Sequence, residues 1–114
     1  MIAVIFEVTP AEGRAADYFS MAMALKADVE RMDGFISVER FESVTTPGKF
    51  LSLSVWRDEA ALTRWRAHGR HQTMQKAGRS EVFADYRLRV ASVIRDYGMT
   101  ERGEAPEDAV ALHG

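Results

Sequence analysis

Hydrophobic and polar residues alternate with a period of about two in four short segments that are rich in β-branched and aromatic side chains. This pattern predicts strands. The predicted strands are Ile2–Thr9, Phe35–Ser43, Phe50–Trp56 and Tyr86–Tyr97. The alternation in the second strand gives two faces, Phe35 with Phe41 and Ile36 with Val38. Between the second and third strands, adjacent Pro and Gly residues predict a hairpin turn.

The third and fourth predicted strands also have distinct faces. In the third, one face carries Leu51, Leu53 and Val55. In the last, the apolar face is Tyr86, Leu88, Val90 and Ile94, and the opposite face carries Arg87, Arg89 and Arg95. We expect the arginine stripe to be solvated or to lie between subunits.

Two segments follow the helical period instead. Thr9 is placed to cap the first helix, with Pro10 in its first turn and Glu12 three residues after the cap. Apolar residues then recur every three or four positions: Ala15, Tyr18, Ala22, Leu25, Val29 and Met32. Gly34 is expected to end this helix.

Asp58 is positioned to cap a second helix. The inward face of that helix is predicted to carry Leu62, Trp65, Gly69 and Gln72, with Ala61 and His68 beside them. Because glycine is a poor helix former, we expect a break or bend near Gly69 or Gly78.

The predicted element order is βαββαβ, which indicates an α+β, ferredoxin-like fold with a four-stranded antiparallel sheet. Right-handed crossovers place both helices on one face of that sheet. The other face carries apolar side chains and needs cover. We therefore expect a homodimer that packs sheet against sheet.

A length of 114 residues predicts one domain. We assign it to residues 1–99, followed by an acidic, flexible C-terminal tail at 100–114 that floats or lies across a partner subunit. The net charge of −2 gives no basic surplus that would indicate nucleic acid. The absence of cysteine excludes disulfides, thiolate nucleophiles, zinc knuckles and iron–sulfur ligation.

The N-terminal stretch Met1–Pro10 is apolar but has no basic region before it and contains Glu7. It does not match a signal peptide, and the apolar stretches are shorter than the roughly 20 residues of a membrane span. We therefore expect a cytoplasmic protein with no membrane partner.

The main candidates for chemistry are Trp65, His68 and His71, which lie within about two helical turns. An imidazole can move a proton near neutral pH, and an indole N–H can hold a substrate oxygen. The plain alternatives are a core tryptophan and surface or helix-end histidines. The two histidines have a spacing that a metal could use, but no carboxylate follows at the next turn, so no metal site is expected.

Four further residues are predicted to line a substrate pocket: Arg40, Ser52, Ser54 and Tyr86. The serines could equally be small residues under a helix. Neither a nucleophile elbow nor a glycine-rich dinucleotide or phosphate loop is present.

The run from Leu51 to Leu62, followed by Trp65 and His71, resembles the antibiotic biosynthesis monooxygenase family. These are small proteins of the dimeric α+β barrel class. Their third strand ends in a Trp, and an acidic turn leads into a helix that carries an aromatic residue or His. Trp56 and Trp65 match this pattern. The segments 2–13 and 33–35 also resemble the family, so the likeness covers about residues 1–97.

The resemblance implies a homodimeric, cofactor-independent monooxygenase that oxidises a small aromatic phenol or quinol to a quinone. It implies that Trp65 donates a hydrogen bond to the oxygen on which negative charge develops. It also implies that His68 or His71 acts as the base or proton relay, and that Arg40 or Tyr86 assists. The phenol-oxidising branch tends to carry Asn where this chain has Ala61.

The alternative is a non-catalytic dimeric module that binds a hydrophobic ligand or haem. Haem degradation ranks lower, because the axial-His position of that branch falls on Lys76 and its first-strand Asn position falls near Glu7.

Overall fold

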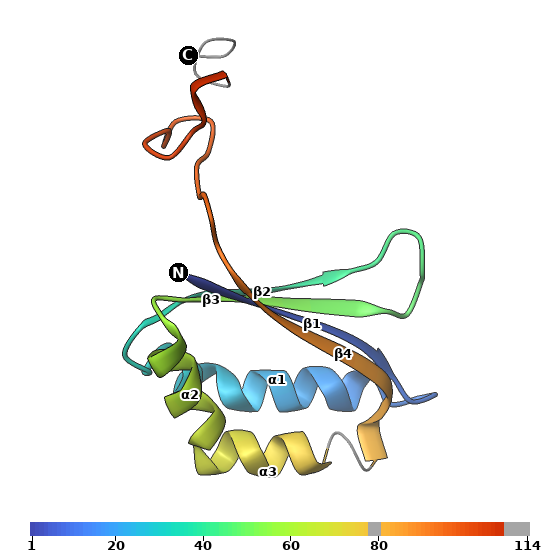
Figure 1. The fold of residues 1–114 in the computed structure, drawn as a ribbon. Helices are drawn as coiled ribbons and strands as arrows, with labels where there is room; N and C mark the ends of the chain where they lie inside the picture. The colour runs from blue at the N-terminus through green and yellow to red at the C-terminus, as the bar shows by residue number, and fades with distance from the viewer. Residues whose placement is uncertain (78–80, 109–114) are drawn as a thin grey trace.

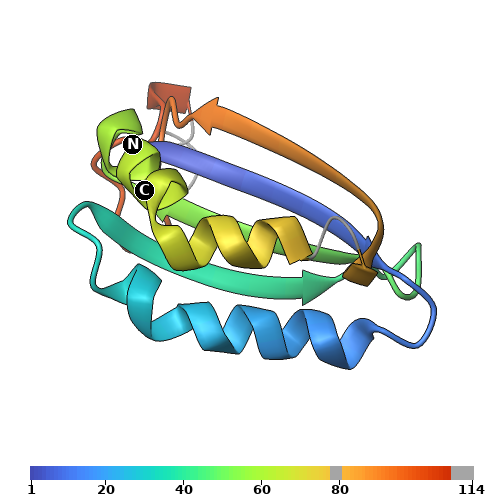
Figure 2. The same ribbon diagram turned by 90° about the horizontal axis from the view of Figure 1, so that it is seen from below.

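The computed structural model describes residues 1–77 and 81–108 of the chain. Its elements follow in the order β1 (Ile2–Pro10), α1 (Ala15–Glu30), β2 (Phe35–Glu42), β3 (Phe50–Trp56), α2 (Glu59–Ala67), α3 (Gly69–Ala77) and β4 (Phe83–Ser92). The strands form one antiparallel sheet in the order β2-β3-β1-β4. All three helices lie on one side of the sheet (Figures 1 and 2). The predicted ferredoxin-like α+β fold is confirmed.

The strand register separates a helix-facing side of the sheet from an open side. On β1, Val4 and Val8 are buried and pack with residues of the helices, so even-numbered residues of β1 face the helices. Val4 pairs with Ser54 and Phe6 with Ser52, which brings both serines to the same side. Leu51, Leu53 and Val55 therefore point to the open side.

The core consists of two hydrophobic clusters between the helices and the sheet. The larger contains Val4, Val29, Trp56, Ala61, Leu62 and Trp65. The smaller contains Val8, Tyr18 and Val82. They sit near opposite ends of β1, and the space between them is where the candidate site lies.

The first helix begins later than the sequence predicts. Pro10 still belongs to β1 and pairs with Phe83, and the Ala11 N–H donates to the Val82 carbonyl at 2.7 Å. Gly13 then adopts a positive φ of 75°, and the helix begins at Ala15. The predicted cap at Thr9 is wrong, because pairing with β4 keeps this segment extended.

The predicted faces of the second strand are also wrong. Phe35 pairs with Trp56 and Ser37 with Val55, so a bulge falls between Phe35 and Ser37 and shifts the register. Phe35 consequently packs on the core cluster, while Phe41 lies on the open side and is 42% exposed.

The last strand runs from Phe83 to Ser92 rather than from Tyr86 to Tyr97. Tyr86, Leu88 and Val90 do share one side of the sheet, as predicted, because they pair with Val8, Phe6 and Val4. Ile94 and Arg95 lie beyond the strand, and Ile94 is 81% exposed. After Ser92 the chain projects away from the sheet (Figure 1).

The second helical segment is interrupted next to Gly69, one of the two positions at which the sequence predicts a break. α2 ends at Ala67, His68 adopts an extended conformation with ψ 128°, and α3 begins at Gly69. The second possible break, at Gly78, lies outside the described residues. The inward Leu62 and Trp65 are buried as predicted, whereas Gln72 is exposed.

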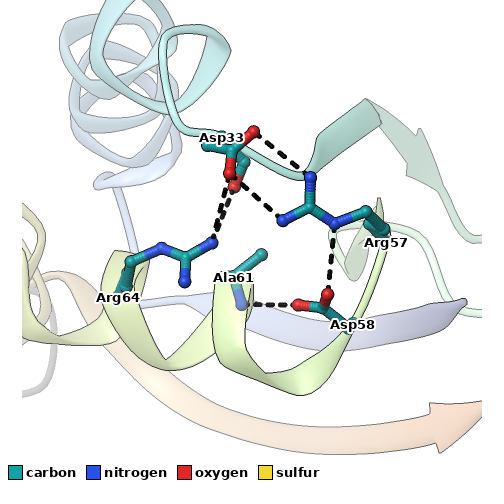
Figure 3. A network of polar contacts seen from close by, with 5 residues as sticks. All are labelled: Asp33, Arg57, Asp58, Ala61 and Arg64. Carbon is teal, nitrogen blue, oxygen red and sulfur yellow. Dashed lines mark hydrogen bonds and ion pairs between the residues drawn. The ribbon is translucent and has the colours of Figure 1, made fainter.

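The start of α2 is fixed by a polar network (Figure 3). The Ala61 N–H donates to Asp58 Oδ1 at 2.9 Å, which confirms the predicted cap. Arg57 donates to both oxygens of Asp33, at 3.2 and 3.1 Å, and to Asp58. These contacts lower the pKa of both carboxyl groups. Because the network is exposed, we assign it to positioning the helix rather than to stability.

Gly34 is required where the loop after α1 meets α2. Its φ is +88°, and a Cβ there would lie 2.5 Å from the Ala61 Cβ. Gly48 has a similar φ of +85°, but a Cβ there would meet nothing within 4 Å. The backbone penalty of about 1–2 kcal/mol is thus common to both positions. Gly34→Ala is expected to cost about 1–3 kcal/mol more than Gly48→Ala because of overpacking.

Urea unfolding of the two variants beside the wild type measures this difference. Equal losses of unfolding free energy in Gly34→Ala and Gly48→Ala would show that the contact with Ala61 relaxes without cost.

Candidate functional site

A cavity of about 1200 Å³ lies between the helix-facing side of the sheet and the helices, and most of its lining is apolar. Every strand and every helix contributes to its wall. The helices leave β4 largely uncovered (Figure 2). Tyr86, Leu88 and Val90 on this strand are 41%, 47% and 42% exposed although they face the helix side. A cavity of this size and character suits a small organic ligand.

Trp65 and His71 form one wall of the cavity. Trp65 is on α2 and His71 on α3, and their ring centroids are 4.8 Å apart. The extended residue between the two helices turns the chain so that both rings reach the same place. Behind Trp65, the ring of Trp56 follows at 6.4 Å and is fully buried. The core thus holds the indole in position.

The surroundings of His71 favour the neutral form of its imidazole. Burial lowers the pKa of its imidazole below the ordinary value of 6.5, and the nearby His68 and Arg66 lower it further, while a hydrogen bond to the Arg66 backbone opposes the shift. Its Nδ1 is buried and has no hydrogen-bond partner among the described residues. A neutral imidazole in the wall of the cavity can accept a proton from a ligand.

His68 occupies a different place from His71. Its ring stacks against Trp65 with centroids 5.4 Å apart, but the residue does not line the cavity. Its Nδ1 is buried and unpartnered within the described part of the chain. The structure therefore brings Trp65 and His71 together at the cavity wall, whereas His68 contacts Trp65 without lining the cavity.

The four pocket residues predicted from the sequence all line the cavity. Arg40 and Ser52 are opposite each other on β2 and β3. The Ser54 hydroxyl accepts a hydrogen bond from Trp56 Nε1 at 3.0 Å. The ring centroid of Tyr86 lies 5.8 Å from that of Phe6.

Tyr18 belongs to the site although no pattern in the sequence singled it out. Its helical spacing predicts a core residue, and it is indeed 5% exposed. However, it lines the cavity, and its hydroxyl has no hydrogen-bond partner among the described residues. Burial raises its pKa, and the Arg40 guanidinium acts in the opposite direction. The hydroxyl is therefore protonated near neutral pH and able to donate.

No group of three His, Asp or Glu side chains in the described part of the chain is arranged to hold a metal. Lys76, at the position that carries the axial ligand in the haem-degrading branch, lines the cavity. Glu7 faces the open side of the sheet, where it pairs with Arg89 and with Lys49 at 3.1 Å. Ala61 is fully buried beside Gly34, and Leu62 rather than Ala61 reaches the cavity.

No described helix is long and apolar enough to cross a bilayer.

The model of the antibiotic biosynthesis monooxygenase family matches residues 1–77, and the chain belongs to this family. The chain is 44% identical over 93 residues to a protein of Pyricularia oryzae named jasmonate monooxygenase ABM. That match covers 82% of this chain and 43% of the relative, so the chain spans less than half of that protein. It is 31% identical to the Bacillus subtilis protein YqjZ, covering 82% of this chain and 79% of YqjZ.

The fold is shared with solved structures. SnoaB, described as a cofactor-independent oxygenase from Streptomyces nogalater and solved as a mutant, matches with a TM-score of 0.72 and 17% identity. The match covers 83% of this chain and 94% of SnoaB. The architecture and the family predicted from the sequence are therefore confirmed.

The lowered pKa of His71 predicts a stability change in mild acid. Between the folded pKa and the unfolded value near 6.5, the unfolded chain binds more protons than the folded one. The free energy of unfolding should therefore fall as the pH drops below about 6.5 and level off below the folded pKa. Glu7, Asp33 and Asp58 have lowered pKa values, so their contributions are lost in a separate window, in stronger acid.

Urea unfolding between pH 7.5 and about 2.5 measures this effect, with His71→Phe as the matched variant. In the variant, the free energy of unfolding should no longer fall just below about pH 6.5, but it should still fall in stronger acid. A first decrease of equal size in both proteins would assign it to another group.

Proposed function

We propose that the chain is a cofactor-independent monooxygenase that oxidises a small phenol or quinol to a quinone inside this cavity. The observation that carries the proposal is the pair of Trp65 and His71 in the wall of the cavity, with ring centroids 4.8 Å apart. Membership of the family, and a relative whose name describes a monooxygenase, support the reaction class.

In the proposed reaction, His71 accepts the phenol proton. The resulting electron-rich phenolate reduces dioxygen directly, which removes the need for a metal or flavin. One oxygen atom enters the ring as the second quinone oxygen, and the other leaves as water. The phenol itself supplies the four electrons. The Trp65 N–H stabilises the negative charge that develops on oxygen, and the apolar walls strengthen that interaction by excluding water.

The proposal is tested with 1-naphthol and dissolved oxygen, whose expected product is 1,4-naphthoquinone. Oxygen uptake and quinone absorbance should rise in proportion to protein concentration, above the rate without protein. Saturable binding of 1-naphthol with no oxygen uptake would instead support the alternative, a non-catalytic binding module. A Soret shift on titration with haemin would indicate haem as the ligand of such a module.

We also propose that two copies of the chain pack through the open side of the sheet. This side carries the partly exposed Ile5, Leu51, Leu53 and Val55 together with Phe41. The ion pairs of Glu7 with Lys49 and Arg89 lie beside them. A contiguous apolar area on a sheet is covered by a second copy in a self-complementary dimer. The exposed Ile94 and Met99 in the segment that projects from the sheet would gain cover from the same partner.

The dimer is expected to dissociate when a charge is placed at its centre. Leu53 lies between Ile5 and Glu39 on the open side. Leu53→Glu should therefore convert the wild-type dimer into a monomer of about 12.8 kDa. Met23→Glu is the control, because Met23 is on α1 and 65% exposed.

Light scattering coupled to size-exclusion chromatography measures both variants. The control should keep the dimer mass. A wild-type protein that elutes as a monomer, or a Leu53→Glu variant that stays dimeric, would contradict this arrangement.

A further inference from the structure

In the described protein, the end of the cavity away from Trp65 holds two polar side chains, Tyr18 and Arg40, which lie close enough to interact electrostatically. Tyr18, from α1, is only 5% exposed, and its hydroxyl has no hydrogen-bond partner there. Arg40, from β2, has a buried and equally unpartnered Nε, and no ion pair of Arg40 occurs among the described residues. Both residues line the cavity.

Unsatisfied donors in such a place are costly. A buried polar group without a partner loses its hydrogen bonds to water, and a charged group loses more than a neutral one. Native proteins keep few such groups, and each one calls for an explanation. The nearby rings of Phe50 and Phe83, whose centroids both lie 6.1 Å from that of Tyr18, offer neither donor nor acceptor. The charge of Arg40 has no ion-pair partner among the described residues, so a bound anion would supply the partner that this end of the cavity lacks.

The chemistry of the pair specifies the ligand group. A guanidinium and a protonated phenol are both donors, and together they carry one positive charge. The planar fork of an arginine matches a carboxylate, and the Tyr18 hydroxyl can donate to the same group. Burial keeps this hydroxyl protonated by raising its pKa.

The position of the pair fixes the length of the ligand. Arg40 is paired with Ser52 on β3. Four positions further along β3 comes Trp56, and the ring of Trp65 packs against it. At about 3.3 Å per residue, the two ends of the cavity are roughly 13 Å apart. Val4 and Val38, which are level with Ser54, line the space between them. A carboxylate with two fused rings is shorter than this distance, which leaves room for a contact with the protein at each end.

We propose that Arg40 and Tyr18 form an anion-recognition end of the cavity, so that the preferred ligand is a small apolar or aromatic molecule with a single carboxylate at the end remote from Trp65. This inference rests on the proposed function in placing the substrate in the cavity, and it adds the class of substrate. The carboxylate anchors the ligand, and the apolar body then presents its other end to His71.

The test is a binding measurement with a pair of ligands that differ only in charge. 2-Naphthoate and its methyl ester are titrated into the protein, and the quenching of tryptophan fluorescence is followed without any turnover. The wild type should bind the naphthoate on the order of ten to a hundred times more tightly than the ester, as expected for a charged hydrogen bond formed away from water. Arg40→Met should abolish this preference by lowering the affinity for the naphthoate far more than the affinity for the ester. Tyr18→Phe should reduce it by a smaller factor.

Arg31→Met is the matched control, because Arg31 is exposed just after α1 and does not line the cavity. It should keep the full preference. The affinity of Arg40→Met for the ester shows whether that variant is still folded. Equal affinities of the wild type for the two ligands, or a preference that survives in Arg40→Met, would overturn the inference. Because neither ligand is a phenol, this result is independent of whether 1-naphthol is oxidised.

Discussion

Replacing His71 with alanine is expected to lower the rate of 1-naphthol oxidation by on the order of 10²–10⁴-fold, the usual contribution of a positioned general base. The imidazole is the only one in the described chain that lines the cavity, and its lowered pKa keeps it neutral and able to accept a proton at pH 7. The loss should appear mainly in kcat, because the proton transfer occurs in the reaction rather than in binding. Initial rates of oxygen uptake at several substrate concentrations separate the two parameters.

The matched control is His68→Ala. This histidine contacts the same indole, at 5.4 Å between ring centroids, but it does not line the cavity. Its removal should change the rate by less than about tenfold, since it acts on His71 only through charge and packing. A large loss in His68→Ala with a small one in His71→Ala would assign the base to the other ring.

Trp65 is expected to have two separable roles. It is buried against Trp56 and Leu62 in the larger core cluster, so Trp65→Ala should lower the free energy of unfolding by about 3–5 kcal/mol, as removal of a large buried side chain does. Trp65→Phe keeps most of the ring but removes the N–H. It should retain most of the stability and lose on the order of 10²-fold in kcat, the effect of deleting one donor to a developing negative charge.

Trp56→Phe is the control for the loss of an indole N–H, because that of Trp56 already donates to Ser54 at 3.0 Å. Urea unfolding and oxygen uptake should show that this variant loses far less kcat than Trp65→Phe. If Trp65→Phe kept the wild-type kcat, Trp65 would be a core residue with no part in the reaction.

The fold was predictable because the patterns that define it are local. Alternation in four segments and helical spacing in two were sufficient for the order of elements and hence for the sheet topology. The errors arose where long-range pairing decided the outcome. Pro10 fits a helix start by its type, but pairing with Phe83 keeps it in β1. The bulge between Phe35 and Ser37 is likewise a property of the register with β3 rather than of the residues themselves.

The site was partly predictable. Spacing of three residues on a helix did not distinguish His68 from His71. The extended backbone at His68 separates them, and the sequence indicated only that a break would occur near Gly69 or Gly78. Tyr18 was missed because its position in an apolar helical face is the same for a core residue and for a cavity donor. The difference lies in the unpartnered hydroxyl, which depends on the neighbours that the fold supplies.

The most direct test of the proposed function is turnover of 1-naphthol under ¹⁸O₂ by the chelator-treated protein, followed by mass spectrometry of the quinone. The proposed reaction predicts 1,4-naphthoquinone with one ¹⁸O atom, formed in proportion to protein and lost in His71→Ala. Product no faster than in the protein-free solution, or quinone without the label, would contradict it.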